Sequence, residues 1–360
     1  MEDEIPNWLE RADSFCARFG LRLPILLAPM AGACPPALSR AVMAAGGMGA
    51  CGALLMQPNE IADWCRELRD GGDLPFQLNL WVPDQRPERD AAHEARVRAF
   101  LAQWGPAVPP EAGDAVPPDF ARQGDAILEA RPAAASSIMG LFPPALVRRL
   151  KAVGIPWLAT ATTVAEARMA VEAGADAIVA QGMEAGGHRG AFDPGAAERQ
   201  LVGLFALLPA IADAVHVPVI AAGGIADGRG IAAAFALGAS AVSIGTAFLR
   251  SPEAGIDPAW AGALGAAQPE DTILTRAFSG RAGRALATAY VRAATSPDAP
   301  LPAPYPVQRG LTAAMRAQAQ RSHDLDAMQA WAGQAARLAP AAPATEITDR
   351  LWREARALLG

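Results

Sequence analysis

The chain has 360 residues, 52% of them hydrophobic, with 34 glycines and a formal net charge of −6. This length is enough to bury a large core, and it suits either one large barrel with appendages or two domains. The acidic balance, with Lys151 as the only lysine, argues against a surface for nucleic acid or anionic membranes.

Compartment and metal content can also be inferred from composition. No apolar run is long enough to span a bilayer, and the acidic segment 1–6 lacks the basic and apolar parts of a signal peptide. The four cysteines lack metal-ligand spacing and are interpreted as free thiols: Cys16, Cys34, Cys51 and Cys65. We therefore expect a cytoplasmic enzyme without a bound metal.

Short apolar runs alternate with small-residue helices along most of the chain, a pattern typical of a parallel sheet with helical crossovers. Eight strands are predicted, at 24–28, 48–54, 75–80, 133–138, 156–160, 175–181, 217–222 and 241–245. Helices are predicted at 36–45, 58–69, 143–153, 163–173, 199–214 and 228–237. Eight such units favour an α/β fold of the (β/α)8 TIM barrel type.

Two regions break the alternation. Residues 83–132 are rich in proline and charge and are too long for an ordinary loop, so they are interpreted as an insertion after strand three. We predict a barrel over 15–252, interrupted at about 83–132, a mostly helical capping domain over 253–345, and a C-terminal helix over 346–360.

His188 is the leading candidate for catalysis. It follows the sixth predicted strand in a glycine-rich loop, and in a parallel barrel the loops after the strands carry the active site. An imidazole there can accept a proton or hold an anion near neutral pH, although it could also simply brace the loop.

Glycines follow the last two predicted strands. Gly223 and Gly224 follow the seventh strand, and Gly245 and Thr246 follow the eighth. Bare glycine backbone at these two loops is typical of a phosphate site in this fold, although glycine is also a common turn residue. Asn79 is polar within an apolar strand and could hydrogen-bond a planar ring or belong to an interior polar layer.

Together these segments resemble the nitronate monooxygenase family, formerly called 2-nitropropane dioxygenases. The resemblance covers nearly the whole barrel, and 331–334 is similar to the closing segment of the family. The matching motifs are Ala28-Pro29-Met30, Phe76-Gln77-Leu78-Asn79, Gln181-Gly182-Met183-Glu184-Ala185-Gly186-Gly187-His188, Ala222-Gly223-Gly224-Ile225, Ile244-Gly245-Thr246 and Trp331-Ala332-Gly333-Gln334.

The resemblance implies an FMN-dependent enzyme that oxidises alkyl nitronates with O2 to an aldehyde or ketone plus nitrite. Whether it also uses neutral nitroalkanes is left open. It implies that His188 is the catalytic residue, which deprotonates a nitroalkane or lies beside the nitronate. The positive charge that stabilises anionic flavin would come from His188, Arg189 or a helix N-terminus.

The resemblance also assigns binding residues. Those implied to contact the flavin ring are Ala28, Pro29, Met30, Asn79 and Gln181, and those around its ribityl and phosphate are Gly186, Gly187, Gly223, Gly224, Gly245 and Thr246. Candidate substrate contacts from the cap are Tyr305, Trp331 and Gln334. The expected partners are therefore the small-molecule nitronate and O2, and the oligomeric state is left open.

Two departures from the family pattern concern the substrate pocket. The segment 136–140 replaces an aromatic-rich motif, and the insertion after strand three is long. Two alternatives are therefore kept. One is an FMN- and NADH-dependent enoyl-acyl-carrier-protein reductase, and the other is a flavin-free phosphate-binding barrel acting as a lyase or isomerase.

Overall fold

The computed structural model describes residues 7–72 and 74–360, so the acidic segment 1–6 discussed above lies outside the described residues. Eight parallel strands form the main sheet, in the order β1-β9-β8-β6-β5-β4-β3-β2. A bridge between Leu26 and Met48 joins its two edge strands, so the sheet closes into a barrel. The strands are β1 (Ile25–Leu27), β2 (Gly49–Gly52), β3 (Phe76–Trp81), β4 (Ala134–Ile138), β5 (Trp157–Ala161), β6 (Ala177–Gln181), β8 (Val219–Ala222) and β9 (Ala241–Ile244).

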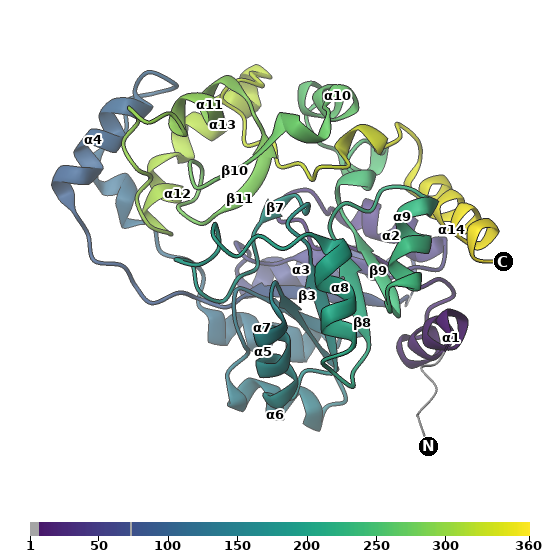
Figure 1. Ribbon diagram of the computed structural model, residues 1–360. Helices are drawn as coiled ribbons and strands as arrows, with labels where there is room; N and C mark the ends of the chain where they lie inside the picture. The colour runs from purple at the N-terminus through teal and green to yellow at the C-terminus, as the bar shows by residue number, and fades with distance from the viewer. Residues whose placement is uncertain (1–6, 73) are drawn as a thin grey trace.

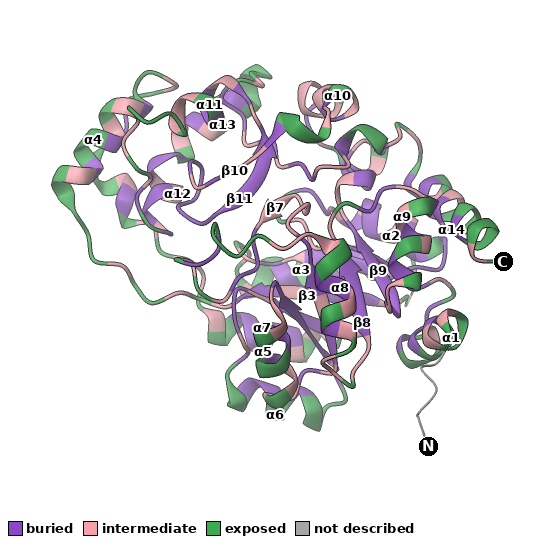
Figure 2. Cartoon of the chain, viewed as in Figure 1, coloured by how far each residue is buried: buried purple, intermediate pink, exposed green. Residues whose placement is uncertain are grey.

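Helices surround this barrel, and the predicted (β/α)8 fold is confirmed. Their apolar faces are buried against the strands, whereas their outer faces are exposed (Figure 2). The helices of this layer are α2 (Pro36–Ala44), α3 (Pro58–Arg69), α5 (Phe120–Ala130), α6 (Pro144–Ala152), α7 (Val164–Glu172), α8 (Leu204–Ala212), α9 (Gly228–Ala236) and α14 (Ala344–Leu359).

The C-terminal helix α14 is part of the barrel. It packs against α9 and α2, and thereby occupies the place of the eighth barrel helix, although about 100 residues separate it from β9 (Figure 1). The whole cap is therefore inserted between the last barrel strand and the last barrel helix.

An N-terminal helix that the sequence pattern did not indicate, α1 (Trp8–Phe19), closes the bottom of the barrel. Its Phe15 and Phe19 are buried in one cluster with residues from the start of the strands, such as Leu158 and Ile220. Burial of each of these large side chains contributes about 2 kcal/mol of stability, so the helix seals the end opposite the carboxyl ends of the strands.

The structure divides the segment 83–132 into two parts. α5 at its end packs against α3 and α6 in the barrel layer, whereas α4 (Ala91–Leu101) and η1 (Pro110–Asp114) join the cap. Val97 and Leu101 of α4 share a core with Phe278 and Tyr290, and η1 packs against α12 (Val307–Leu311). The part of the insertion with α4 and η1 is therefore a structural part of the cap (Figure 1).

The cap contains a β-hairpin in addition to the expected helices. β10 (Thr272–Thr275) and β11 (Gly283–Leu286) pair antiparallel, and the two-residue strand β7 (Gly187–His188) adds to the edge of β11. Figure 1 shows β7 between the barrel and this hairpin. The other cap elements are η2 (Thr246–Phe248), η3 (Pro252–Ala254), α10 (Pro258–Ala266), η4 (Pro269–Asp271), α11 (Ala289–Ala294), α13 (Ala313–Ser322) and η5 (Ala336–Leu338).

Within the described residues, no helix has both the length and the apolar composition that crossing a membrane requires.

Candidate active site

His188 lies where the barrel and the cap meet. The loop from β6 carries it onto the cap sheet, where it is opposite Gly283 in β11, and the N–H of Arg189 donates to the carbonyl of Ala282 at 2.8 Å. Arg284 also holds this loop, because its Nε donates to the carbonyl of Met183 at 3.0 Å. The position of the imidazole is therefore fixed by both domains.

Aromatic rings surround the imidazole. The ring centroid of Trp81, at the end of β3, lies 4.7 Å from that of His188 in an edge arrangement, and Trp331 lies 4.9 Å away. Tyr305 stacks on Trp81 with centroids 4.6 Å apart. Two of the three predicted substrate contacts, Trp331 and Tyr305, thus belong to one cluster with His188.

The surroundings of His188 favour its neutral form. Burial, with the positive charges of Arg309 and Arg281, lowers the pKa of its imidazole to about 3. Both arginines come from the cap and were not identified from the sequence. The only signal for Arg309 in the sequence was its closeness to Tyr305, four residues earlier.

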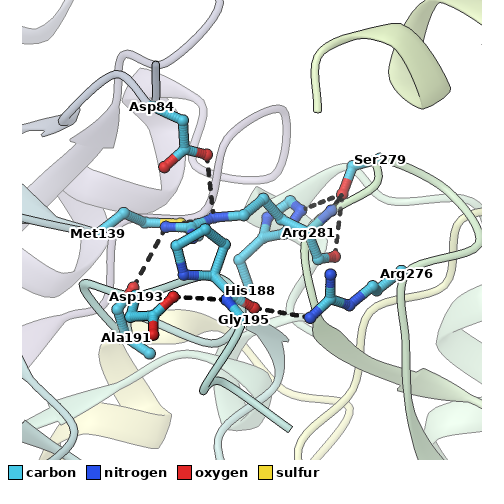
Figure 3. Close-up of polar contacts among 10 residues, drawn as sticks. Asp84, Met139, His188, Ala191, Asp193, Gly195, Arg276, Ser279 and Arg281 are labelled. Carbon is cyan, nitrogen blue, oxygen red and sulfur yellow. Dashed lines mark hydrogen bonds and ion pairs between the residues drawn. The ribbon is translucent and has the colours of Figure 1, made fainter. Parts of the chain in front are cut away.

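Arg281 is a buried cation beside this cluster. Its side chain is 3% exposed, its Nε lies 3.4 Å from Oδ2 of Asp84, and its Nη2 donates to the carbonyl of Ala191 (Figure 3). Nη1 of Arg281 has no hydrogen-bond partner among the described residues. Because a buried guanidinium with a free N–H favours an anion nearby, this part of the site is suited to negatively charged ligands.

A cavity adjoins the aromatic cluster. Its volume is about 360 Å³, and its lining includes Asp84, Arg276, Arg281 and Tyr305. Met139, in the segment that departs from the family pattern, has a φ of 70° and packs against Trp81 and Tyr305. A left-handed conformation at a residue other than glycine is strained, so this turn is held in place by its surroundings.

The glycine-rich loops converge on the loop that carries His188. A Cβ added at Gly223 would lie 3.0 Å from the N atom of Ala185, and one added at Gly186 would lie 2.5 Å from that of Gly333. Gly333 also donates to Oγ1 of Thr246 at 3.0 Å. The loops after β6, β8 and β9 are thus in direct contact, and the segment around Gly333 closes over them.

This convergence suits the phosphate of a mononucleotide. Gly223 and Gly224 have φ angles of 104° and 70°, which favour glycine. Among the hydrogen bonds within residues 7–72 and 74–360, none is donated by the backbone N–H of Gly223, Gly224 or Thr246. The N-terminus of α9 is different, because the carboxylates of Asp227 and Glu354 already accept from its N–H groups.

The remaining predicted binding residues are placed as follows. A Cβ added at Gly245 would lie 3.3 Å from Cβ of Ala28 and 3.2 Å from Sδ of Met30, so the loop that holds Ala28, Pro29 and Met30 borders the glycine loops. Asn79 donates to Oγ of Ser136 at 3.0 Å.

Gln181 and Gln334 have loop-bracing contacts. The amide of Gln181 donates to the carbonyl of His188 at 3.1 Å and accepts from the N–H of Gly190 at 2.8 Å. The backbone N–H of Gln334 donates to the carbonyl of Glu184. The structure therefore places both residues against the loop that carries His188.

Arg189, a predicted source of positive charge, is committed to the same loop. Its side chain is 4% exposed and donates to the carbonyl oxygens of Gln181 and Gln200. Burial lowers the pKa of its guanidinium to about 10. Arg309 and Arg281 are the cations whose charge acts on His188.

Comparison with known proteins agrees with this geometry. A family model described as nitronate monooxygenase matches residues 15–354. Two curated nitronate monooxygenases are each 41% identical to this chain. The match to the Paraburkholderia phytofirmans protein covers 93% of this chain and 93% of that protein, and the match to the Pseudomonas aeruginosa protein covers 96% and 99%.

A solved nitroalkane oxidase from Streptomyces ansochromogenes is 35% identical, with a TM-score of 0.86, over 96% of this chain and 100% of that one. The resemblance inferred from the motifs is thereby confirmed, and the protein is an oxidoreductase. The chain belongs to the nitronate monooxygenase family.

Proposed function

We propose that the protein is an FMN-dependent enzyme that oxidises alkyl nitronates with O2 to an aldehyde or ketone plus nitrite. The observation that carries this proposal is an imidazole packed against two tryptophans, with the buried Arg281 and the half-buried Arg309 acting on it and a glycine-lined loop cluster next to it. When bound, FMN would supply the electron acceptor that this chain itself lacks.

The residues present fit FMN. The N–H groups of Gly223, Gly224 and Thr246 would hold its phosphate. The two glycines have positive φ angles and no side chain to block approach, and none of the three N–H groups donates another hydrogen bond within the described residues. The loop with Ala28, Pro29 and Met30 and the side chain of Asn79 would border the ring, and Gly186, Gly187 and Gly245 would leave room for the ribityl chain. The contacts of Gln181 support a role in holding the His188 loop as well.

The charges favour a nitronate over a neutral nitroalkane. Arg281 and Arg309 attract an anion into a site lined by aromatic rings. A base whose conjugate acid has a pKa of about 3 is poorly matched to removing a proton from carbon at neutral pH. A bound nitronate would itself raise the pKa of His188, because an opposite charge stabilises the imidazolium.

The test is oxygen consumption and nitrite release by the flavin-loaded protein given an alkyl nitronate. We expect both, and we expect His188→Asn to retain flavin while losing most turnover. NADH oxidation with an enoyl thioester and no nitrite would instead support the reductase. A colourless protein that takes up no FMN would favour the flavin-free lyase or isomerase.

A further inference from the structure

Ser279 contacts the catalytic imidazole directly from the cap. Its side chain is 1% exposed, in the loop between β10 and β11, and its Oγ lies 2.7 Å from Nε2 of His188 (Figure 3). The two residues are 91 positions apart in the sequence. Nothing in the pattern of strand ends pointed to this contact, because Ser279 lies outside the barrel.

The hydrogen bonds of Ser279 identify which imidazole nitrogen carries the proton. Its Oγ lies 3.2 Å from the carbonyl oxygen of Arg281 and 3.3 Å from the N atom of Arg281. A serine hydroxyl offers one proton and two acceptor positions. All three contacts are satisfied together when Nε2–H of His188 and N–H of Arg281 donate to Oγ, and the hydroxyl donates to the carbonyl.

The opposite arrangement leaves a group unsatisfied. If the hydroxyl donated to Nε2, the carbonyl oxygen of Arg281 would lose its donor, and no other donor to it occurs within the described residues. An unsatisfied buried carbonyl is costly, so the first arrangement is favoured.

The surroundings of the ring make this choice important. The rings of Trp81 and Trp331 pack against it, and the charged groups that act on it are Arg309 and Arg281, of which Arg281 is paired with Asp84 and Arg309 lies near the phenol of Tyr305. Two nearby cations favour the uncharged imidazole. In an uncharged imidazole only one nitrogen can accept a proton, and that nitrogen is set by the bond that the other nitrogen makes.

We propose that Ser279 is a positioning residue that holds His188 as its Nε2–H tautomer and leaves Nδ1 as the nitrogen that accepts a proton. Proton uptake at Nδ1 requires no rearrangement, because Nε2–H donates to Ser279 both before and after it. The consequence for catalysis rests on the proposed nitronate oxidation, whereas the tautomer itself does not.

The tautomer can be measured in the intact flavin-loaded protein by two-bond ¹H–¹⁵N correlation spectra of ¹⁵N-histidine-labelled samples. The chain has 4 histidines, and the signals of His188 are those missing from His188→Asn. We expect a protonated Nε2 and an unprotonated Nδ1. A wild-type His188 protonated at Nδ1 would overturn the proposal without any Ser279 variant.

Variants separate positioning from packing. We expect Ser279→Ala to give a mixture of the two tautomers and about a tenfold lower kcat, with unchanged FMN content. Ser279→Thr retains the hydroxyl and should restore the wild-type tautomer. A single wild-type tautomer in Ser279→Ala would contradict the proposal.

Ser39 offers a matched control. It is also fully buried. Its Oγ donates to the carbonyl of Ala50 at 2.9 Å and accepts from the backbone N–H of Ala50 at 3.1 Å, so these bonds involve no histidine. Ser39→Ala should leave the His188 spectrum as in the wild type. If the expected tautomer is seen but no nitrite is released, only the proposed function is rejected. If nitrite is released but His188 is the other tautomer, only the role of Ser279 is rejected.

Discussion

Gly283 and His188 face each other across the antiparallel pair of β11 and β7, so a glycine of the cap defines the place of the proposed catalytic histidine. A Cβ added at Gly283 would lie 3.0 Å from two ring atoms of Trp331 and 3.1 Å from the carbonyl oxygen of Gly187. The cap hairpin, the tryptophan and the histidine are therefore packed without spare room.

This relationship predicts that Gly283→Ala lowers kcat/KM for nitronates by about tenfold while FMN content stays unchanged, because a small displacement at a catalytic group is costly. Kinetics and flavin absorbance check this. Gly262→Ala, where a Cβ would meet nothing within 4 Å, is the control. A fully active Gly283→Ala protein would show that the fit against Trp331 is unimportant.

The low pKa of His188 predicts how activity depends on pH. Since the free enzyme has a neutral imidazole above about pH 3, kcat/KM for a nitronate should show no inflection near the ordinary histidine value of 6.5. Measurement between pH 5 and 8, with a nitronate above its own pKa, is the check. An inflection near 6.5 that disappears in His188→Asn would contradict the burial argument.

Arg309 should act on both substrate and histidine. We predict that Arg309→Gln raises KM for nitronates by about tenfold, because the site loses a half-buried cation near the anion. We also predict that it raises the pKa of His188, because a repelling charge is removed. Steady-state kinetics and histidine NMR titration measure the two effects. Arg321→Gln, an exposed position on α13, controls for the loss of one charge. An unchanged KM would place the substrate away from Arg309.

The barrel could be predicted from the sequence because local signals specify it. Each strand is a short apolar run followed by a turn, and the observed strands lie within one to two residues of most predicted ends. His188 and the glycine loops follow strands, so they could be found in the same way. Trp81, at the end of β3, also lies at a strand end, but nothing in the sequence distinguishes it from a tryptophan of the hydrophobic core.

The cap could not be predicted in this detail because its contacts are long-range. Ser279 and Arg281 reach His188 only because β11 pairs with β7, and α4 joins the cap core only through packing with Phe278 and Tyr290. No period or spacing along the chain encodes such pairings. The helix α1 was missed for a similar reason. Its buried face packs against the bottom of the barrel, and the helix is not part of a strand–helix repeat.

The proposed phosphate site predicts an effect on flavin binding. Gly223→Val should lower FMN occupancy, because a side chain at a φ of 104° is strained and its Cβ would lie 3.0 Å from the N atom of Ala185. Flavin absorbance per protein measures occupancy. Gly154→Val tests strain alone, since Gly154 has a φ of 73° and a Cβ there would meet nothing within 4 Å. Full occupancy in Gly223→Val would place the phosphate elsewhere.

His188 also links stability to pH. Its pKa is about 3 in the folded protein and about 6.5 in the unfolded chain, so between these values the unfolded chain binds more protons. The free energy of unfolding therefore falls as the pH drops below 6.5, by at most about 1.4 kcal/mol per pH unit, and His188 adds no pH dependence above that range.

Urea unfolding at pH 7 and pH 5, with saturating FMN, measures this contribution. The wild type should lose more stability than His188→Asn on going to pH 5, because asparagine takes up no proton on unfolding. His216→Asn, which removes an exposed imidazole below the barrel, should lose as much as the wild type. Equal losses in the wild type and His188→Asn would mean that His188 is solvated in the folded protein. The argument that a neutral imidazole makes the site selective for nitronates would then be wrong.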